Sequence, residues 1–181
     1  MVASANSEGV VMVWDAATGK VRHELDANEE STTALALSPD GRRLAAGGDG
    51  DAIQVWNLET EHRDEQLKGH RDTISALAFS PDGTLLASGS DDRSIELWQT
   101  ADWTKVADFI ADSRAVRALG FSPDGSRLAT GGGQRVVKVW PTARVGEAQL
   151  CAEIAAEVTS SELRDELGDG IQPEACTNLT G

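Results

Sequence analysis

The sequence contains no long apolar run. None of its stretches approaches the roughly 18 to 20 apolar residues that a membrane-spanning helix needs, and residues 1–12 lack the basic and apolar blocks of a secretory signal peptide. We therefore expect a cytoplasmic protein that does not enter a membrane. Its 181 residues, 40% hydrophobic and 25% charged, have the balance of one soluble globular domain.

Basic residues are scarce. Lys and Arg together number 16 against 30 Asp and Glu, which gives a formal net charge of -14. Proteins that bind nucleic acid present Lys and Arg to the phosphates, and an acidic surface repels polyanions. The composition therefore argues against a nucleic-acid partner, and the acidic excess itself is typical of a solvated surface.

Only two cysteines occur, Cys151 and Cys176, and both lie in the last 31 residues. Neither belongs to a Cys-x-x-Cys pair of the kind that holds zinc, so no metal site is predicted. The two residues either form a disulfide that ties the end of the tail to its first helix or remain free thiols, as in most cytosolic proteins. The sequence leaves both alternatives open.

The sequence does contain a repeat of 42 residues. Tryptophan follows an aliphatic residue at positions 14, 56, 98 and 140, and the tetrapeptide Ser-Pro-Asp-Gly begins at positions 38, 80 and 122. Two independent markers with the same spacing identify an internal repeat.

Each repeat has the pattern of short β-strands joined by tight turns. In Ser-Pro-Asp-Gly, proline fixes φ at the first corner and glycine accepts a positive φ, so the tetrapeptide predicts a hairpin. In the repeat around Trp98, runs at 76–79, 85–88, 95–98 and 106–110 predict four strands. Four strands in each repeat of this length are the signature of a propeller blade.

Residues 1–141 resemble WD-repeat β-propellers. The repeat that contains Gly69-His70, the tetrapeptide at 80–83 and Leu97-Trp98 has nearly the whole family pattern, although Gln99 replaces the usual Asp. The resemblance implies an all-β fold, an incomplete propeller of about three and a half four-stranded antiparallel blades. The expected blades are 1–26, which is partial, 31–68, 73–110 and 115–141.

The resemblance also implies a buried hydrogen-bond chain within a blade, formed in the best repeat by His70, Ser88, Asp92 and Trp98. The other repeats keep only parts of this set. Asn28 and Asp112 replace the His, Gly50, Gln134 and Glu8 replace the Asp, and Ala46 replaces the Ser, while Thr130 and Ser4 keep a hydroxyl. We expect those blades to rely on packing.

His70, Ser88 and Asp92 are also the residue types of a catalytic triad. We interpret them as structural, because a buried His needs a partner for each ring nitrogen and only one repeat carries the set. The glycine-rich segments 47–51 and 131–133 lack the following helix of a phosphate loop and the closing Glu of a calcium loop. No cofactor is predicted, and we expect a protein that is not an enzyme.

In WD-repeat propellers, the face that carries Gly-His and the Asp-bearing turn is the usual docking surface. At the matching positions, called the rim below, hydroxyls, carboxylates and one guanidinium are available to a protein or peptide. The rim residues are Ser31, Thr33, Asp49, Thr73, Ser75, Asp91 and Arg117, with Ala115 and Gly133 at the corresponding positions of the last blade. Arg117 has the chemistry to bind a partner's carboxylate in a bidentate manner.

Residues 142–181 predict a short C-terminal α-helical tail. Apolar residues at 148, 150, 151, 154 and 155 fall on one face of a helix, and residues 159–162 have the spacing of a capping box for a second helix that ends at Gly168. The tail resembles the C-terminal extension of bacterial multidomain WD-repeat proteins, in which a kinase or nucleotide-hydrolysing domain often precedes the propeller.

The family layout predicts three strands in the first blade, four in each of the next two and three in the last. The first blade lacks its innermost strand and the last lacks its outermost, so an open arc exposes apolar faces and strand edges. We interpret Met1 as a truncated start. The remaining propeller blades or another copy of the chain are the expected partners of these open ends.

Together these patterns favour a protein-interaction scaffold or sensor module, the regulatory C-terminal part of a larger bacterial signalling protein. One alternative is a propeller enzyme with its site at the channel mouth, which requires titratable groups that converge near Arg117 and Asp91. Another is a scaffold that completes its ring by self-assembly, which requires one defined oligomer.

Overall fold

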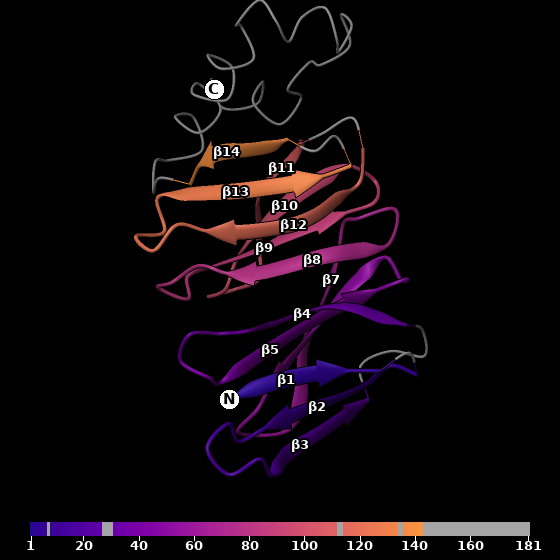
Figure 1. Cartoon of the computed structure of the whole chain (residues 1–181), viewed down its shortest axis with the longest axis vertical. Coiled ribbons are helices and arrows are strands. Elements are labelled where there is room, and N and C mark those ends of the chain that lie inside the picture. Colours follow the sequence, from indigo (N-terminus) through magenta and orange to yellow (C-terminus); the bar gives the residue numbers. More distant parts are fainter. Residues whose placement is uncertain (7, 27–30, 112–113, 134–135, 143–181) are drawn as a thin grey trace, which may run out of the picture.

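The computed structural model describes residues 1–6, 8–26, 31–111, 114–133 and 136–142. Within these residues all regular structure is β, and fourteen strands form four antiparallel sheets (Figure 1). The predicted all-β fold of an incomplete propeller is thereby confirmed. The helices predicted in the tail and the two cysteines, Cys151 and Cys176, lie outside the described residues.

Each sheet is built from strands that are consecutive in the chain. The first sheet contains β1 (Val2–Ala5), β2 (Val10–Trp14) and β3 (Val21–Asp26). The second contains β4 (Thr32–Leu37), β5 (Arg43–Gly48), β6 (Ala52–Asn57) and β7 (His62–Lys68). The third contains β8 (Ile74–Phe79), β9 (Leu85–Ser90), β10 (Ser94–Gln99) and β11 (Lys105–Ile110). The fourth contains β12 (Val116–Phe121), β13 (Arg127–Gly132) and β14 (Val137–Pro141).

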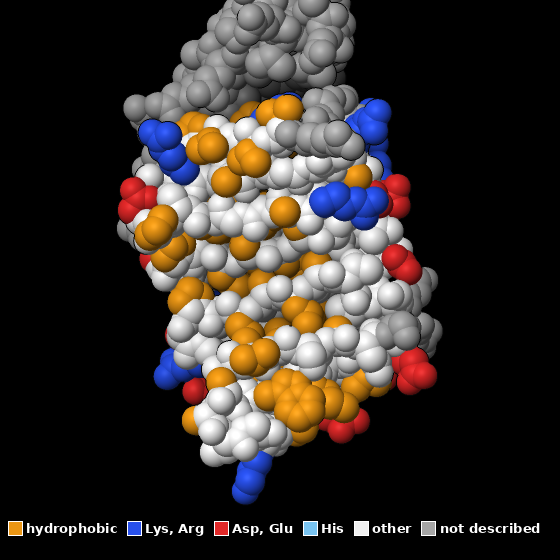
Figure 2. All heavy atoms as spheres, viewed as in Figure 1, with side chains coloured by type: hydrophobic (Ala, Val, Ile, Leu, Met, Phe, Trp, Pro, Cys, Tyr) orange, Lys and Arg blue, Asp and Glu red, His pale blue; other side chains and the backbone are white. Residues whose placement is uncertain are grey.

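The sheets are stacked in chain order, from the first at the bottom of Figure 1 to the fourth at the top. The first strands of the last three sheets, β4, β8 and β12, are neighbours and line one side of the stack. Figure 2 views this side, where hydrophobic and uncharged side chains predominate and charged ones gather at the two edges. The edges are where the strands end and the turns begin.

Each Ser-Pro-Asp-Gly tetrapeptide forms the turn between the first two strands of its sheet. In the third sheet, Ser80 Oγ donates to Asp82 Oδ1 over 2.7 Å and accepts the amide N–H of Leu85 over 2.9 Å. Gly83 has a φ of 71°, a conformation that strains any residue with a Cβ. The serines at 38 and 122 make the same bonds, so the predicted hairpins are confirmed.

The hydrophobic core lies between the sheets. We call the side of a sheet that faces the next sheet in the chain its downstream face, and the opposite side its upstream face. Ile53 and Val55 on the downstream face of the second sheet pack in one cluster with Leu86 and Trp98 on the upstream face of the third. Equivalent clusters join the first sheet to the second and the third to the fourth.

The contribution of this packing to stability can be measured at one repeat position that is buried in the first three sheets and exposed in the fourth. Ile95 is fully buried between two sheets, whereas its counterpart Val137 on the last strand is 69% exposed. We expect Ile95→Ala to lower the free energy of unfolding by about 2 to 5 kcal/mol, because it removes methyl groups and leaves a cavity. Val137→Ala should change it by less than about 0.5 kcal/mol.

Urea titration of both variants at low protein concentration makes this comparison. Equal losses for Ile95→Ala and Val137→Ala would contradict the view that the inter-sheet contacts stabilise the fold.

Candidate interaction site

The first strands of the second, third and fourth sheets each contain a β-bulge near the rim. The pairing with the next strand shifts by one residue at the same place in all three, and the extra residues are Thr33, Ser75 and Arg117. A bulge interrupts the alternation of side chains and re-aims the extra residue. Three of the predicted rim residues therefore owe their direction to the same local irregularity.

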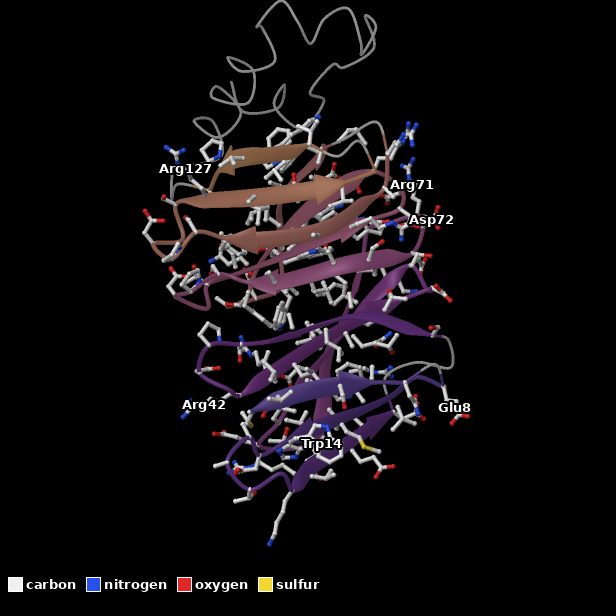
Figure 3. All side chains as sticks on the ribbon, in the orientation of Figure 1. Glu8, Trp14, Arg42, Arg71, Asp72 and Arg127 are labelled. Atoms are coloured by element: carbon white, nitrogen blue, oxygen red, sulfur yellow. The ribbon has the colours of Figure 1, made fainter. Side chains whose placement is uncertain are left out.

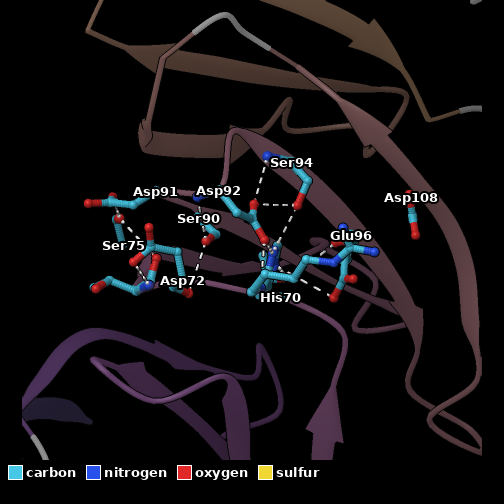
Figure 4. A network of polar contacts seen from close by, with 12 residues as sticks. His70, Asp72, Ser75, Ser90, Asp91, Asp92, Ser94, Glu96 and Asp108 are labelled. Atoms are coloured by element: carbon cyan, nitrogen blue, oxygen red, sulfur yellow. Dashed lines mark hydrogen bonds and ion pairs between the residues drawn. The ribbon is translucent and has the colours of Figure 1, made fainter. Parts of the chain in front are cut away.

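Asp91 is the centre of the rim in the third sheet. Its Oδ1 accepts a hydrogen bond from Ser75 Oγ, as Figure 4 shows, and its Oδ2 lies 2.9 Å from Arg117 Nη2 of the fourth sheet. Arg117 thus already contacts a carboxylate within the chain, although its side chain stays 60% exposed. The contact joins two neighbouring sheets at the rim.

The other rim residues join the second sheet to the third. Thr33 Oγ1 donates to a main-chain carbonyl at the start of β8 over 2.8 Å, and Thr73 Oγ1 lies 3.5 Å from Asp49 Oδ1. Ser31 contributes its carbonyl oxygen, which accepts the amide N–H of Asp49. A Cβ on Gly48 would lie 1.8 Å from that oxygen, so this close approach requires glycine.

The two ends of the strands present different surfaces. Glu8, Arg71 and Asp72 mark the rim end in Figure 3, and Arg42 and Arg127 mark the opposite end beside the Ser-Pro-Asp-Gly turns. At that opposite end a hollow of 310 Å³ is lined by Ser38, Pro39, Asp40, Arg43, Phe79, Asp82 and Gly83. The sequence does not predict this hollow, because its lining comes from two turns that are 42 residues apart.

A buried polar network lies beneath the rim of the third sheet (Figure 4). His70, whose side chain is 1% exposed, has Nε2 2.8 Å from Ser88 Oγ and Nδ1 3.2 Å from Asp92 Oδ2. Trp98 Nε1 donates to Ser88 Oγ over 3.3 Å. Ser94 Oγ, which lies 3.0 Å from His70 Nδ1, adds a hydroxyl that the sequence does not predict.

Asp92 is held in its charged form. Burial by itself raises the pKa of this carboxyl, but hydrogen bonds from Ser94 and from the amide of Arg71, with the charge of His70, lower the pKa to about 2. Ser94 Oγ donates over 2.6 Å and the Arg71 amide over 2.8 Å. Because an ionised carboxylate only accepts hydrogen bonds, His70 Nδ1 is the donor in its contact with Asp92.

The expectation that the other sheets rely on packing alone is wrong for two of them. Trp14 Nε1 donates to Ser4 Oγ over 2.8 Å, and Trp140 Nε1 donates to Thr130 Oγ1 over 3.0 Å. A hydroxyl at the position of Ser88 is therefore enough to accept the hydrogen bond from the tryptophan Nε1, even where no histidine is present. In the second sheet, Ala46 occupies the hydroxyl position and offers no acceptor. The remaining counterparts, Asn28, Asp112 and Gln134, lie outside the described residues.

Glu96 is a buried carboxylate that the sequence analysis does not single out. Its side chain is 3% exposed, with Oε1 2.9 Å from Lys105 Nζ and Oε2 3.7 Å from His70 Nε2. Burial lowers the pKa of Lys105, but hydrogen bonds to Glu96 and to a second carboxylate raise it overall. In the preceding repeat, Gln54 and Arg63 hold the positions of Glu96 and Lys105, and Arg63 donates a hydrogen bond to Gln54. An acceptor followed nine residues later by a basic residue is therefore the sequence signal for the Glu96–Lys105 pair.

The His70 network has no route to a substrate. Ser88 is fully buried, and its hydroxyl accepts a hydrogen bond from Trp98 rather than facing solvent. A nucleophile must reach the atom that it attacks, so this Ser-His-Asp arrangement holds the sheet together.

Among the described residues no group of His, Cys, Asp or Glu is arranged to hold a metal ion, and that part of the chain contains no helix able to cross a membrane.

Three segments of the chain, residues 19–57, 63–99 and 103–141, match the family described as "WD domain, G-beta repeat". The chain belongs to the WD-repeat family. Each WD repeat, as matched, starts within two residues of the beginning of the last strand of one sheet and ends with the third strand of the next.

The WD-repeat chain is also similar to a solved structure, that of U3-55K. The two share 24% sequence identity with a TM-score of 0.66, over 77% of this chain and 47% of that chain. The chain thus spans about half the length of U3-55K, and the likeness shows the fold alone. No match was found among curated proteins.

We expect the stability contributed by Asp92 to depend on pH. Its pKa is lowered in the folded chain from 3.8 to about 2, so the stabilisation is complete above pH 3.8 and is lost as the pH falls towards 2. At neutral pH, Asp92→Asn should lower the free energy of unfolding by about 2 kcal/mol. The difference in free energy of unfolding between Asp92→Asn and the unsubstituted chain should disappear as the pH falls towards 2.

Urea titrations between pH 7 and pH 2 measure this difference, with Asp64→Asn on the exposed strand β7 as the control. A difference for Asp92→Asn that does not change with pH would refute the assigned role of the charge.

Proposed function

We propose that this WD-repeat chain is a protein-interaction scaffold or sensor module whose rim binds a protein or peptide. WD repeats support a scaffold role of this kind. The observation that carries the choice of surface is the convergence on Asp91 of Ser75 from the same sheet and Arg117 from the next. The bulges in the first strands of three sheets place Thr33, Ser75 and Arg117 at this one edge.

The chemistry of the rim suits a ligand that offers both hydrogen-bond donors and acceptors, as a peptide does. Arg117 contacts Asp91 through one of its nitrogens and is 60% exposed, so other N–H groups face solvent. Asp49 is exposed and accepts only a long contact from Thr73. Contacts between sheets hold these side chains in place, which reduces the entropy that binding would cost.

The acidic composition supports a protein or peptide partner over nucleic acid or an anionic membrane. With a formal net charge of -14, the chain repels polyanions and attracts segments rich in Lys and Arg. We assign it no catalytic activity and place it in the cytoplasm. The groups that meet at Asp91 are one hydroxyl and one guanidinium, which are suited to recognition.

We further propose that the chain serves as the regulatory C-terminal part of a bacterial signalling protein with a kinase or nucleotide-hydrolysing domain. The support is the resemblance of residues 142–181, which lie outside the described residues, to the extensions of such proteins. Sequencing the gene upstream of the codon for Met1 tests this part. An upstream reading frame without either kind of domain would refute it.

A displayed peptide library selected against the whole chain tests the rim. Peptides that bind should lose at least about tenfold in affinity with Asp49→Asn or Arg117→Ala, because each change removes a hydrogen bond to a charged group. Asp40→Asn and Arg42→Ala, at the opposite end, are the matched controls and should leave the affinity unchanged. Thermal melting of each variant checks that it folds.

Peptides that are sensitive to the Asp40 and Arg42 changes but not to the rim changes would move the binding surface to the opposite end and overturn the proposal.

A further inference from the structure

Among the described residues, the first and fourth sheets have a packed neighbour on one side only. On β14, at the upper end of the stack, Val137 is 69% exposed and Val139 is 46% exposed. On β1, Val2 is 54% exposed, and Trp14 on the adjacent β2 lies at the lower end of the molecule in Figure 3. The fourth sheet thus has an open downstream face and the first sheet an open upstream face.

The 42-residue repeat identifies what these exposed residues correspond to inside the chain. Val137 and Val139 hold the positions of Ile95 and Leu97, which are 0% and 3% exposed because the next sheet covers them. Val2 holds the position of Leu44, Leu86 and Leu128, all fully buried against the preceding sheet. The exposed residues therefore occupy positions that are elsewhere part of the core.

Inside the chain these two kinds of face pack against each other. Leu128 on the upstream face of the fourth sheet shares one cluster with Ile95 and Leu97 on the downstream face of the third. Over the second and third strands of the repeat, the open face of the fourth sheet and the open face of the first are therefore the two halves of one interface. The innermost strand, which β8 and β12 supply in the interfaces within the chain, has no counterpart in the first sheet. This interface occurs three times within the chain in the same register.

A glycine position supports this interpretation of the open face. A Cβ on Gly47 would lie 2.7 Å from Ile74, and a Cβ on Gly89 would lie 2.6 Å from Val116, because the next sheet closes over both. At the third counterpart, Gly131, a Cβ would meet nothing within 4 Å. In the two earlier repeats the innermost strand of the next sheet takes this place. The first sheet has no innermost strand, so a copy that docks by its first sheet covers Val137 and Val139 and leaves the place beside Gly131 open.

We propose that a second copy of the chain docks head to tail, so that the open face of its first sheet covers Val137 and Val139. The chain itself carries the complementary surface, and the apolar contact keeps the acidic side chains out of the interface. Such a contact between unlike faces forms a ring if the rotation closes. Two copies bring eight sheets, within the range of blade numbers in propellers.

Two single substitutions and their mixture test the proposal on the intact chain. The unsubstituted chain should sediment with twice the 19.1 kDa of one copy. Val139→Asp and Val2→Asp should each weaken association at least about tenfold, because each buries an unpaired carboxylate in the contact. Ile110→Asp is the matched control, since Ile110 is 51% exposed and its counterpart in the first sheet is Asp26.

Mixing the two variants distinguishes head-to-tail docking from every other arrangement. A Val139→Asp chain keeps an intact first sheet, and a Val2→Asp chain keeps an intact fourth sheet, so the mixture should form mixed dimers that neither variant forms alone. Native mass spectrometry with one variant isotopically labelled detects them. Unchanged thermal melting of both variants at low concentration shows that the chains fold.

Three outcomes would overturn the proposal. The first is a monomeric unsubstituted chain, which would leave the two faces to other blades. The second is a dimer that withstands Val2→Asp, because it would use like faces or a different surface. The third is a mixture that stays monomeric.

Discussion

The contact between neighbouring sheets is the interaction on which the rest of this structure depends. A sheet of three or four strands is apolar on both faces, and it cannot bury either face by itself. Ile53 and Val55 become fully buried only because Leu86 and Trp98 of the next sheet cover them. The stack of sheets is thus held together one interface at a time, and every interface uses the same repeat positions.

The sequence repeat and the sheet are out of step. The segment 63–99 matches one repeat, yet β7, which it contains, pairs with β6 of the second sheet while β8, β9 and β10 belong to the third. Each repeat therefore spans two sheets. The short segment between β7 and β8 joins the two sheets covalently within one repeat.

Much of the fold could be predicted from the sequence, because the 42-residue spacing fixes the strands and the Ser-Pro-Asp-Gly turns fix the hairpins. The bulges could not, because one unpaired residue among short strands leaves no compositional mark. The resemblance places Arg117 and Asp91 on the same rim, but no pattern predicts their ion pair, since Asp91 lies 26 residues away and belongs to the third sheet.

Glu96 shows a second limit of prediction from pattern. A charged residue between Ile95 and Leu97 has the alternation of a strand with one solvent-facing side, yet its side chain is 3% exposed. The ammonium group of Lys105, on the neighbouring outer strand β11, lies 2.9 Å from its Oε1 and neutralises its charge. Alternation predicts which side of a strand a residue occupies, but burial depends on what the adjacent strand carries.

Asp91 and Asp92 are adjacent in one turn, but Asp91 contacts residues of the rim and Asp92 contacts the buried His70. Asp91 accepts a hydrogen bond from Ser75 and forms an ion pair with Arg117 at the surface, while the next residue, Asp92, anchors the same turn to His70 below. The second sheet folds with Gly50 in place of Asp92 and Ala46 in place of Ser88, and its core is equally well buried. The buried network is therefore not a requirement for forming a sheet of this kind. Its physical effect is to fix the backbone under the part of the rim where contacts from two sheets converge.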